Sequence, residues 1–244
     1  MKNDPYIVAA FLKAKEEENW PTDGTSPIIT LSRHYGAEGE EIALRTCEIL
    51  TNMTDGKRPW VVVDKDIAAR IIESHHLPKR LARFFSGEQV MSIEEHVEAI
   101  VGISMPGESL LEKMTAMIVH LARVGHVVLV GRGAHLITAK FPRAVHVRVI
   151  GSLRRRVERI SQQEKCSSEE ASDKIKTTDE NRRRFLATNF QSDVEDPLKY
   201  DLIFNTDRIS VEEASRLIAH LVSSPNFRDE QAGKLSELRQ HVLG

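Results

Sequence analysis

The sequence predicts a doubly wound α/β fold built on one parallel, five-stranded β-sheet. Short runs rich in β-branched and apolar residues alternate along the chain with longer segments in which apolar residues recur at helical spacing. Several of the short runs are apolar throughout, which is typical of parallel strands buried on both faces. Strands that alternate with helices form right-handed βαβ units, and such units build a parallel sheet.

The predicted elements follow one another in a regular order. The strands are Ile28–Ser32, Trp60–Asp64, Val127–Val130, Ala144–Ile150 and Leu202–Asn205. The helices are Glu40–Leu50, Lys65–His75, a long insert within Ser92–Val124, Ser152–Glu164, Ser168–Asn189 and Val211–Val222. Ser210 with Glu213 three residues later is a capping-box pattern, so we expect the last helix to begin there.

Helical segments are also predicted on both sides of the sheet domain, which we place at residues 27–225. Residues 1–26 form an N-terminal extension with a helix at Pro5–Glu18, and residues 226–244 form an amphipathic C-terminal helix. The simplest expectation is that both helices pack on the core. A contact between two copies of the chain is the alternative.

Composition narrows the classes of function. The 244 residues include 41% hydrophobic and 29% charged residues, which suits one globular domain. No apolar run reaches the ~18 residues needed to cross a bilayer, so we expect a cytoplasmic protein with no membrane partner. The net charge of −2 disfavours a nucleic-acid partner. Cys47 and Cys166 have neither the spacing of a zinc site nor that of a disulfide framework.

The stretch Ile28–Ala43, IITLSRHYGAEGEEIA, has the layout of a phosphate-binding loop. A β-rich run ends in a polar turn that contains Gly36 and Gly39, and a helix follows. Backbone N–H groups of such a turn, together with the helix dipole, bind anions, and glycine permits the close approach of the backbone. The lysine and the Ser/Thr that such loops normally carry are missing.

Several segments resemble the cytidylate kinase-like family of P-loop nucleoside monophosphate kinases. The most specific are SRxxGxxGxxIA at Ser32–Ala43 and the GRG of Gly131–Gly133, which is followed by Phe141 and Pro142. VVVDKDI, LRRRVERI, TTDENRRR and DPLKYDLIFNT add to the resemblance, which runs from about Ile28 to Val222. It implies a P-loop nucleoside monophosphate kinase fold, with an acceptor-binding insert at about 65–125 and a lid at about 152–190.

In that family the glycine loop binds the triphosphate of ATP, and Mg²⁺ accompanies the nucleotide. The resemblance implies that the cofactor-binding residues are Ser32, Arg33, Gly36, Ala37, Glu38, Gly39, Glu40 and Glu41. Gly39 stands at the position of the loop lysine and Glu41 at that of the Mg²⁺-binding threonine. The sequence therefore does not assign the Mg²⁺ ligands. Arg33 is the closest cation that could take the place of the lysine.

The acceptor site is expected beside the ends of the second and third predicted strands, where open α/β sheets bind ligands. Asp64, Lys65 and Asp66 follow the second strand, and Gly131, Arg132 and Gly133 follow the third. The resemblance implies that these residues bind the substrate and that Arg132 grips the acceptor phosphate. Helix capping is the alternative for Asp64 and Asp66. Gly133 stands where the GRD motif of cytidylate kinases carries Asp, which weakens the case for cytidine, and Val130 stands where a related kinase often carries an Asp associated with Mg²⁺.

Two clusters of arginines are expected to form the lid. The resemblance implies catalytic roles for Arg156, Arg159, Arg182 and Arg183 alongside Arg132, and a substrate contact for Asp179. The alternative is a solvated charged face with ion pairs such as Asp179–Arg183 and Glu180–Arg184.

These expectations lead to ATP-dependent phosphoryl transfer to a nucleoside monophosphate, with CMP or dCMP suggested by the resemblance. The first alternative is a degenerate relative that binds nucleotide without transfer, as a sensor or interaction module. The missing lysine, hydroxyl and carboxylate favour that alternative. A phosphotransferase for another small metabolite is the second.

Overall fold

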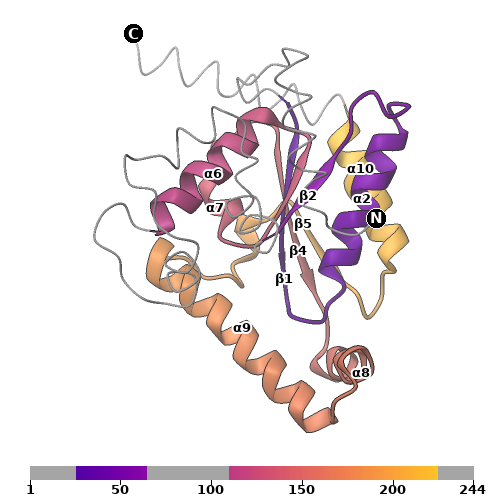
Figure 1. The fold of residues 1–244 in the computed structure, drawn as a ribbon, viewed down its shortest axis with the longest axis vertical. Coiled ribbons are helices and arrows are strands. Elements are labelled where there is room, and N and C mark those ends of the chain that lie inside the picture. The colour runs from indigo at the N-terminus through magenta and orange to yellow at the C-terminus, as the bar shows by residue number, and fades with distance from the viewer. Residues whose placement is uncertain (1–25, 65–109, 225–244) are drawn as a thin grey trace, which may run out of the picture.

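The computed structural model describes residues 26–64 and 110–224 (Figure 1). The predicted helices at Pro5–Glu18, Lys65–His75 and 226–244 lie outside these residues, as does the first part of the 92–124 insert.

The described residues contain a five-stranded, all-parallel sheet. Its strands are β1 (Ile28–Arg33), β2 (Val61–Val63), β3 (Val127–Val130), β4 (Ala144–Ile150) and β5 (Leu202–Asn205). The order across the sheet is β2-β3-β1-β4-β5, so β1 lies in the centre. The register pairs Ile28 of β1 with Val127 of β3 and with Ala144 of β4. The α/β class and the five predicted strands are confirmed.

Helices connect these strands and cover the sheet. They are α2 (Gly39–Asn52), α6 (Leu110–Val124), α7 (Ala134–Ile137), α8 (Leu153–Glu164), α9 (Ser168–Phe190) and α10 (Val211–Ser223), with a 3-10 turn, η1, at Pro197–Lys199. The capping box of Ser210 and Glu213 at the start of α10 is confirmed, and Ser167 with Glu170 forms a second one at α9. The sequence interpretation missed α7 and η1, because elements this short show no periodicity.

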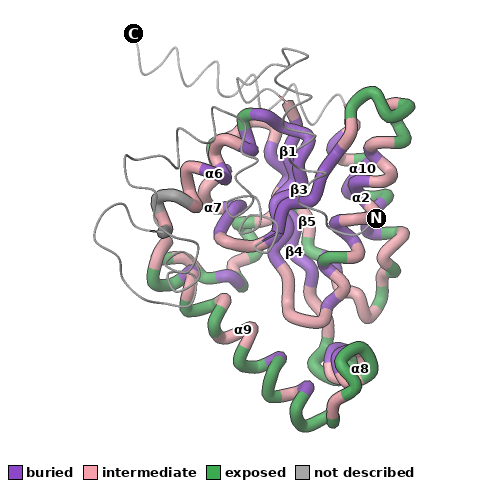
Figure 2. The backbone as a smooth tube through the Cα atoms, in the orientation of Figure 1, coloured by how far each residue is buried: buried purple, intermediate pink, exposed green. Residues whose placement is uncertain are grey.

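The core consists of two layers of apolar side chains on opposite faces of the sheet. Ile42 of α2 and Ile218 of α10 pack on one face. Leu121 of α6 and Ala134 of α7 pack on the other. Figure 2 shows the strands as the most deeply buried part of the fold. The α8–α9 pair extends beyond the carboxyl end of β1 and has its own small core around Ile160 and Ile175 (Figure 1).

Candidate active site

A cavity of about 370 Å³ lies at the carboxyl ends of β1 and β3. Helix α9, the turn after β3 and the segment before η1 complete its wall. The charged residues that line it are Arg33, Arg132, Arg148, Arg182, Arg183, Asp179 and Glu195. Its volume falls within the roughly 300–1,000 Å³ of small-molecule sites. Since five guanidinium groups face two carboxylates, the cavity favours anionic ligands.

Arg33, the last residue of β1, lies beneath the turn that follows β3. Its side chain is only 11% exposed, and its Nη2 lies 3.8 Å from Glu40 Oε1. A Cβ on Gly131 would lie 2.5 Å from Arg33 Nη1, so glycine at position 131 makes room for the guanidinium. Burial lowers the pKa of Arg33, and the carboxylates of Glu40 and Asp64 act in the opposite direction.

Helix α9 brings two further arginines to the cavity. Arg182 Nη1 donates to the backbone oxygen of Arg33 at 3.0 Å, and its guanidinium lies 5.7 Å from the centre of the Tyr35 ring. Burial, followed by the positive charge of Arg33, lowers the pKa of Arg182 to about 10. Arg183 donates to Glu180 Oε2 at 2.7 Å.

The predicted surface pairs on α9 are partly corrected. Glu180 accepts from Arg184 at 3.0 Å, as expected. Asp179 pairs with Arg156 and Arg182, and Arg183 pairs with Glu180, so the expected Asp179–Arg183 pair is wrong. The reason is that Asp179 turns toward the β1–α2 turn and away from the outer face of α9.

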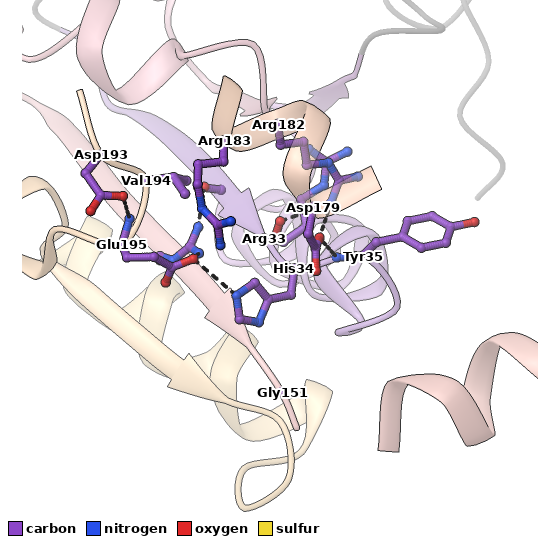
Figure 3. Close-up of polar contacts among 12 residues, drawn as sticks. Arg33, His34, Tyr35, Gly151, Asp179, Arg182, Arg183, Asp193, Val194 and Glu195 are labelled. Carbon is purple, nitrogen blue, oxygen red and sulfur yellow. Dashed lines mark hydrogen bonds and ion pairs between the residues drawn. The ribbon is translucent and has the colours of Figure 1, made fainter. Parts of the chain in front are cut away.

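Asp179, on α9, bonds both to the turn after β1, where Figure 3 shows it next to Tyr35, and to Arg156 of α8. Its Oδ1 accepts from the backbone N–H of Tyr35 at 2.8 Å, and its Oδ2 accepts from Arg156 Nη1 at 2.6 Å. Arg156 also donates to the backbone oxygens of Gly151 at 3.0 Å and Tyr35 at 3.2 Å. In this network the Arg156 guanidinium therefore donates its hydrogen bonds to other groups of the protein.

The predicted donor loop is packed against α8. Gly36 has a φ of +77°, and a Cβ there would lie 2.9 Å from Ile160 Cγ1. Arg159 donates to Glu38 Oε1 and to Glu41 Oε1, both at 2.5 Å. Ser32 and Arg33 line the cavity. The other predicted donor residues, Gly36, Ala37, Glu38, Gly39, Glu40 and Glu41, are absent from its wall.

A polar network that sequence reasoning missed lies along the wall of the cavity. Arg148, whose side chain is 3% exposed, donates to Ser32 Oγ at 3.0 Å and to Glu195 Oε1 at 2.6 Å. Glu195 Oε1 also lies 3.4 Å from His34 Nε2 (Figure 3). An arginine inside the apolar β4 run was the available signal for Arg148, whereas no pattern pointed to Glu195.

His135 and Tyr200 extend this network. Their rings stack with centroids 5.0 Å apart, and Tyr200 donates its hydroxyl hydrogen to the backbone oxygen of Val194 at 2.9 Å. Burial, with a contribution from the charges of His146, Arg148 and Lys199, lowers the pKa of His135 to about 4. His135 is therefore neutral at pH 7.

The model of the cytidylate kinase-like family matches residues 28–208. The chain belongs to the cytidylate kinase-like family. Among solved structures, an uncharacterized protein from Eubacterium ventriosum has a TM-score of 0.57 at 16% identity, over 82% of this chain and 99% of that one. At that identity the likeness concerns the fold. TT1252 from Thermus thermophilus matches at 17% identity over 81% of this chain and 97% of that one, with a TM-score of 0.39. No curated protein matches the sequence.

In this cytidylate kinase-like chain, the predicted acceptor residues are only partly brought together. Gly131, Arg132 and Gly133 line the cavity, and all three have positive φ. Asp64 is buried after the end of β2 and is not among the lining residues. Lys65 and Asp66 lie outside the described residues. Arg182, Arg183 and Asp179 line the cavity, while Arg156 and Arg159 contact the β1–α2 turn.

Across residues 26–64 and 110–224, no group of three or more His, Cys, Asp or Glu side chains is placed to hold a metal ion. No helix in the same ranges is both long and apolar enough to span a membrane. Cys47 is buried, Cys166 is half-buried, and both are free thiols.

Proposed function

We propose that this member of the cytidylate kinase-like family transfers the γ-phosphoryl group of ATP to a nucleoside monophosphate. The observation that carries the proposal is the convergence of arginines from β1, β4, α9 and the turn after β3 on one cavity at the carboxyl edge of the sheet. Guanidinium groups match the geometry of phosphate oxygens and stay charged at neutral pH. CMP and dCMP are the acceptors that the family suggests first.

In the proposed reaction, an oxygen of the acceptor phosphate attacks the γ-phosphorus of ATP. The bond between that phosphorus and the β–γ bridging oxygen breaks, and ADP leaves. Positioning and charge stabilisation account for most catalysis of this type. Mg²⁺ would enter with ATP as part of the substrate.

We assign the following roles within this proposal. Arg132 binds the acceptor phosphate, and Arg182 and Arg183 stabilise charge on the group in transfer. The backbone N–H groups between Gly36 and Glu40, at the start of α2, bind the ATP phosphates. Asp64, Lys65 and Asp66 remain proposed contacts for the acceptor nucleoside.

One observation favours the second candidate, which is nucleotide binding without transfer. Arg156 and Arg159, expected to close over the transferring phosphoryl group, hold Asp179, Glu38 and Glu41 instead. In addition, the Asp179 carboxylate accepts the Tyr35 N–H at the turn. Transfer then requires these pairs to open when ATP binds.

Calorimetric titration and a coupled assay separate the two candidates. The full chain is titrated with Mg–ATP and with CMP, and ADP formation is followed with each common nucleoside monophosphate. Turnover with any acceptor supports transfer. Binding without turnover supports the second candidate, and absence of binding by every nucleotide contradicts both.

A further inference from the structure

Three of the cavity arginines come from three separate elements and meet at the end of β1. Arg33 ends β1, Arg132 lies in the turn after β3, and Arg182 lies on α9. The hydrogen bond from Arg182 to the Arg33 backbone ties α9 to this strand end. Burial is the main cause that lowers the pKa of Arg33, and the charge of Arg132 acts in the same direction. Cations held together in a poorly solvated place are costly unless an anion joins them.

Arg33 and Arg182, whose side chains are 11% and 28% exposed, have only distant carboxylate partners among the described residues. Arg33 pairs with Glu40 at 3.8 Å, and Arg182 pairs with Asp179 at 3.7 Å. Within the parts of the chain that the structure describes, no hydrogen bond reaches the Arg33 guanidinium. By contrast, Arg156 and Arg159 donate to carboxylates at 2.6 Å and 2.5 Å. The N–H groups of Arg33 are therefore available to a ligand in the cavity.

The turn after β3 is shaped around the Arg33 guanidinium. Gly131, Arg132 and Gly133 have φ values of +80°, +56° and +70°. The left-handed conformation is unfavourable for Arg132, which carries a Cβ, and such strain is concentrated at ligand sites. A Cβ at position 131 would lie 2.5 Å from Arg33 Nη1, so the Arg33 guanidinium would have to shift. A glycine followed by a strained arginine thus brings Arg33 and Arg132 to the wall of one cavity, where the charge of Arg132 acts on Arg33.

We infer that Arg33, Arg132 and Arg182 form one binding site for a phosphate dianion, in which Arg33 supplies positive charge from the end of β1 in a chain that has no loop lysine. This positive charge lies at the end of β1, beneath the turn after β3, and not at the start of α2. This inference rests on the proposed function, because it names the phosphate-binding groups of the same cavity. The phosphate belongs either to the donor or to the acceptor nucleotide.

The test is calorimetric titration of the wild-type chain and of Arg33→Ala, Arg33→Lys and Arg184→Ala with three probes. The probes are inorganic phosphate, Mg–ATP and CMP. We expect Arg33→Ala to weaken phosphate binding by roughly 10- to 100-fold, as for loss of a charged hydrogen-bonding group. Arg33→Lys should retain part of the affinity, because lysine keeps the charge but lacks the planar fork. Arg184 is an exposed arginine of the same helix as Arg182, and Arg184→Ala should bind like the wild type.

The nucleotide probes identify the source of the phosphate. If Arg33→Ala loses affinity for Mg–ATP, the site binds a phosphate of the donor. If Arg33→Ala loses affinity for CMP, the site binds the phosphate of the acceptor. Either result supports the inference. If Arg33→Ala binds all three probes like the wild type while Arg132→Asn does not, the inference fails and the proposed function stands. If the wild type binds no probe, the proposed function fails.

Two readouts cover the case in which Arg33→Ala does not fold. Gly131→Ala keeps Arg33 but displaces its guanidinium, so a folded Gly131→Ala protein with wild-type affinity contradicts the inference. In the wild-type chain, the side-chain N–H resonances of Arg33, assigned by their absence from the spectrum of Arg33→Lys, should shift as phosphate is added. Unshifted resonances at saturating phosphate overturn the inference without any loss-of-function variant.

Discussion

The two sides of the β1 carboxyl end use arginine in opposite ways. On one side, Arg156 and Arg159 of α8 donate to Asp179, Glu38 and Glu41 at 2.5–2.6 Å and fasten the β1–α2 turn to the helical pair. On the other side, Arg33 and Arg182 line a cavity, and the carboxylates paired with them within residues 26–64 and 110–224 lie at 3.7–3.8 Å. Arg156 and Arg159 thus hold parts of the protein together, whereas Arg33 and Arg182 are available to a ligand. Arginine clusters of similar appearance in the sequence therefore differ in role.

The largest expected effect lies on the turn side, at Arg156. Arg156→Ala removes the closest cation of Asp179, and the two side chains are only 10% and 18% exposed. Among the described residues, Asp179 then keeps only the more distant Arg182 guanidinium as a cationic partner, at 3.7 Å, so we expect the free energy of unfolding to fall by about 3 kcal/mol. Urea denaturation measures it. The exposed neighbour Arg155 provides the control, since Arg155→Ala should change stability by less than about 0.5 kcal/mol. If Arg156→Ala and Arg155→Ala lowered the free energy of unfolding equally, Arg156 would not have the structural role that separates the turn side from the cavity side.

The next effect concerns the cavity side and depends on pH. The pKa of His135 is about 4 in the folded chain and about 6.5 in the unfolded one, so the unfolded state binds more protons between these values. The buried, neutral His135 therefore does not disfavour folding above pH 6.5. As the pH falls from 6.5 toward 4, protonation of His135 in the unfolded state lowers the free energy of unfolding. At pH 5 this effect has lowered it by about 2 kcal/mol relative to pH 7.

His135→Phe should reduce the difference in free energy of unfolding between pH 7 and pH 5 by that amount, while keeping a ring against Tyr200. Urea denaturation at the two pH values gives the difference. His220→Gln, an exposed change on α10, should leave it as in the wild type. An unchanged difference in His135→Phe would show that His135 is solvated and is not part of the cavity wall.

A third prediction tests whether the cavity binds the acceptor. Arg132→Asn removes the guanidinium while keeping a residue that tolerates the left-handed backbone. We expect CMP affinity to fall roughly 10- to 100-fold. Titration calorimetry with CMP, with Arg184→Ala as control, decides this. Unchanged affinity would withdraw the acceptor role of Arg132.

The smallest effect is expected at Glu41, on the turn side. Its side chain is 43% exposed, and Arg159 keeps Glu38 as a partner, so Glu41→Gln should change stability by at most about 1 kcal/mol. Removal of one negative charge near the turn should raise Mg–ATP affinity about two- to threefold. Unchanged affinity would place the ATP phosphates away from this turn.

The sequence predicted the architecture because the signals for it are local. Apolar runs located β3, β4 and β5 at their observed bounds, and Ser210 with Glu213 located the start of α10. The same reasoning identified the GRG turn and the arginine-rich helices. It assigned the arginines of α8 and those of α9 to one lid, because residues within a cluster look equivalent along the chain.

Amino-acid order alone determined that this chain forms a parallel α/β sheet with a glycine turn after its central strand and without the usual loop lysine. Only the tertiary structure decided which arginines face the cavity. The deciding contacts join residues far apart in the chain: Asp179 with Tyr35, Arg148 with Glu195, and Gly131 with Arg33. Hydrophobic periodicity fixes which elements form, whereas the partner of a charged side chain depends on which elements meet at the edge of the sheet.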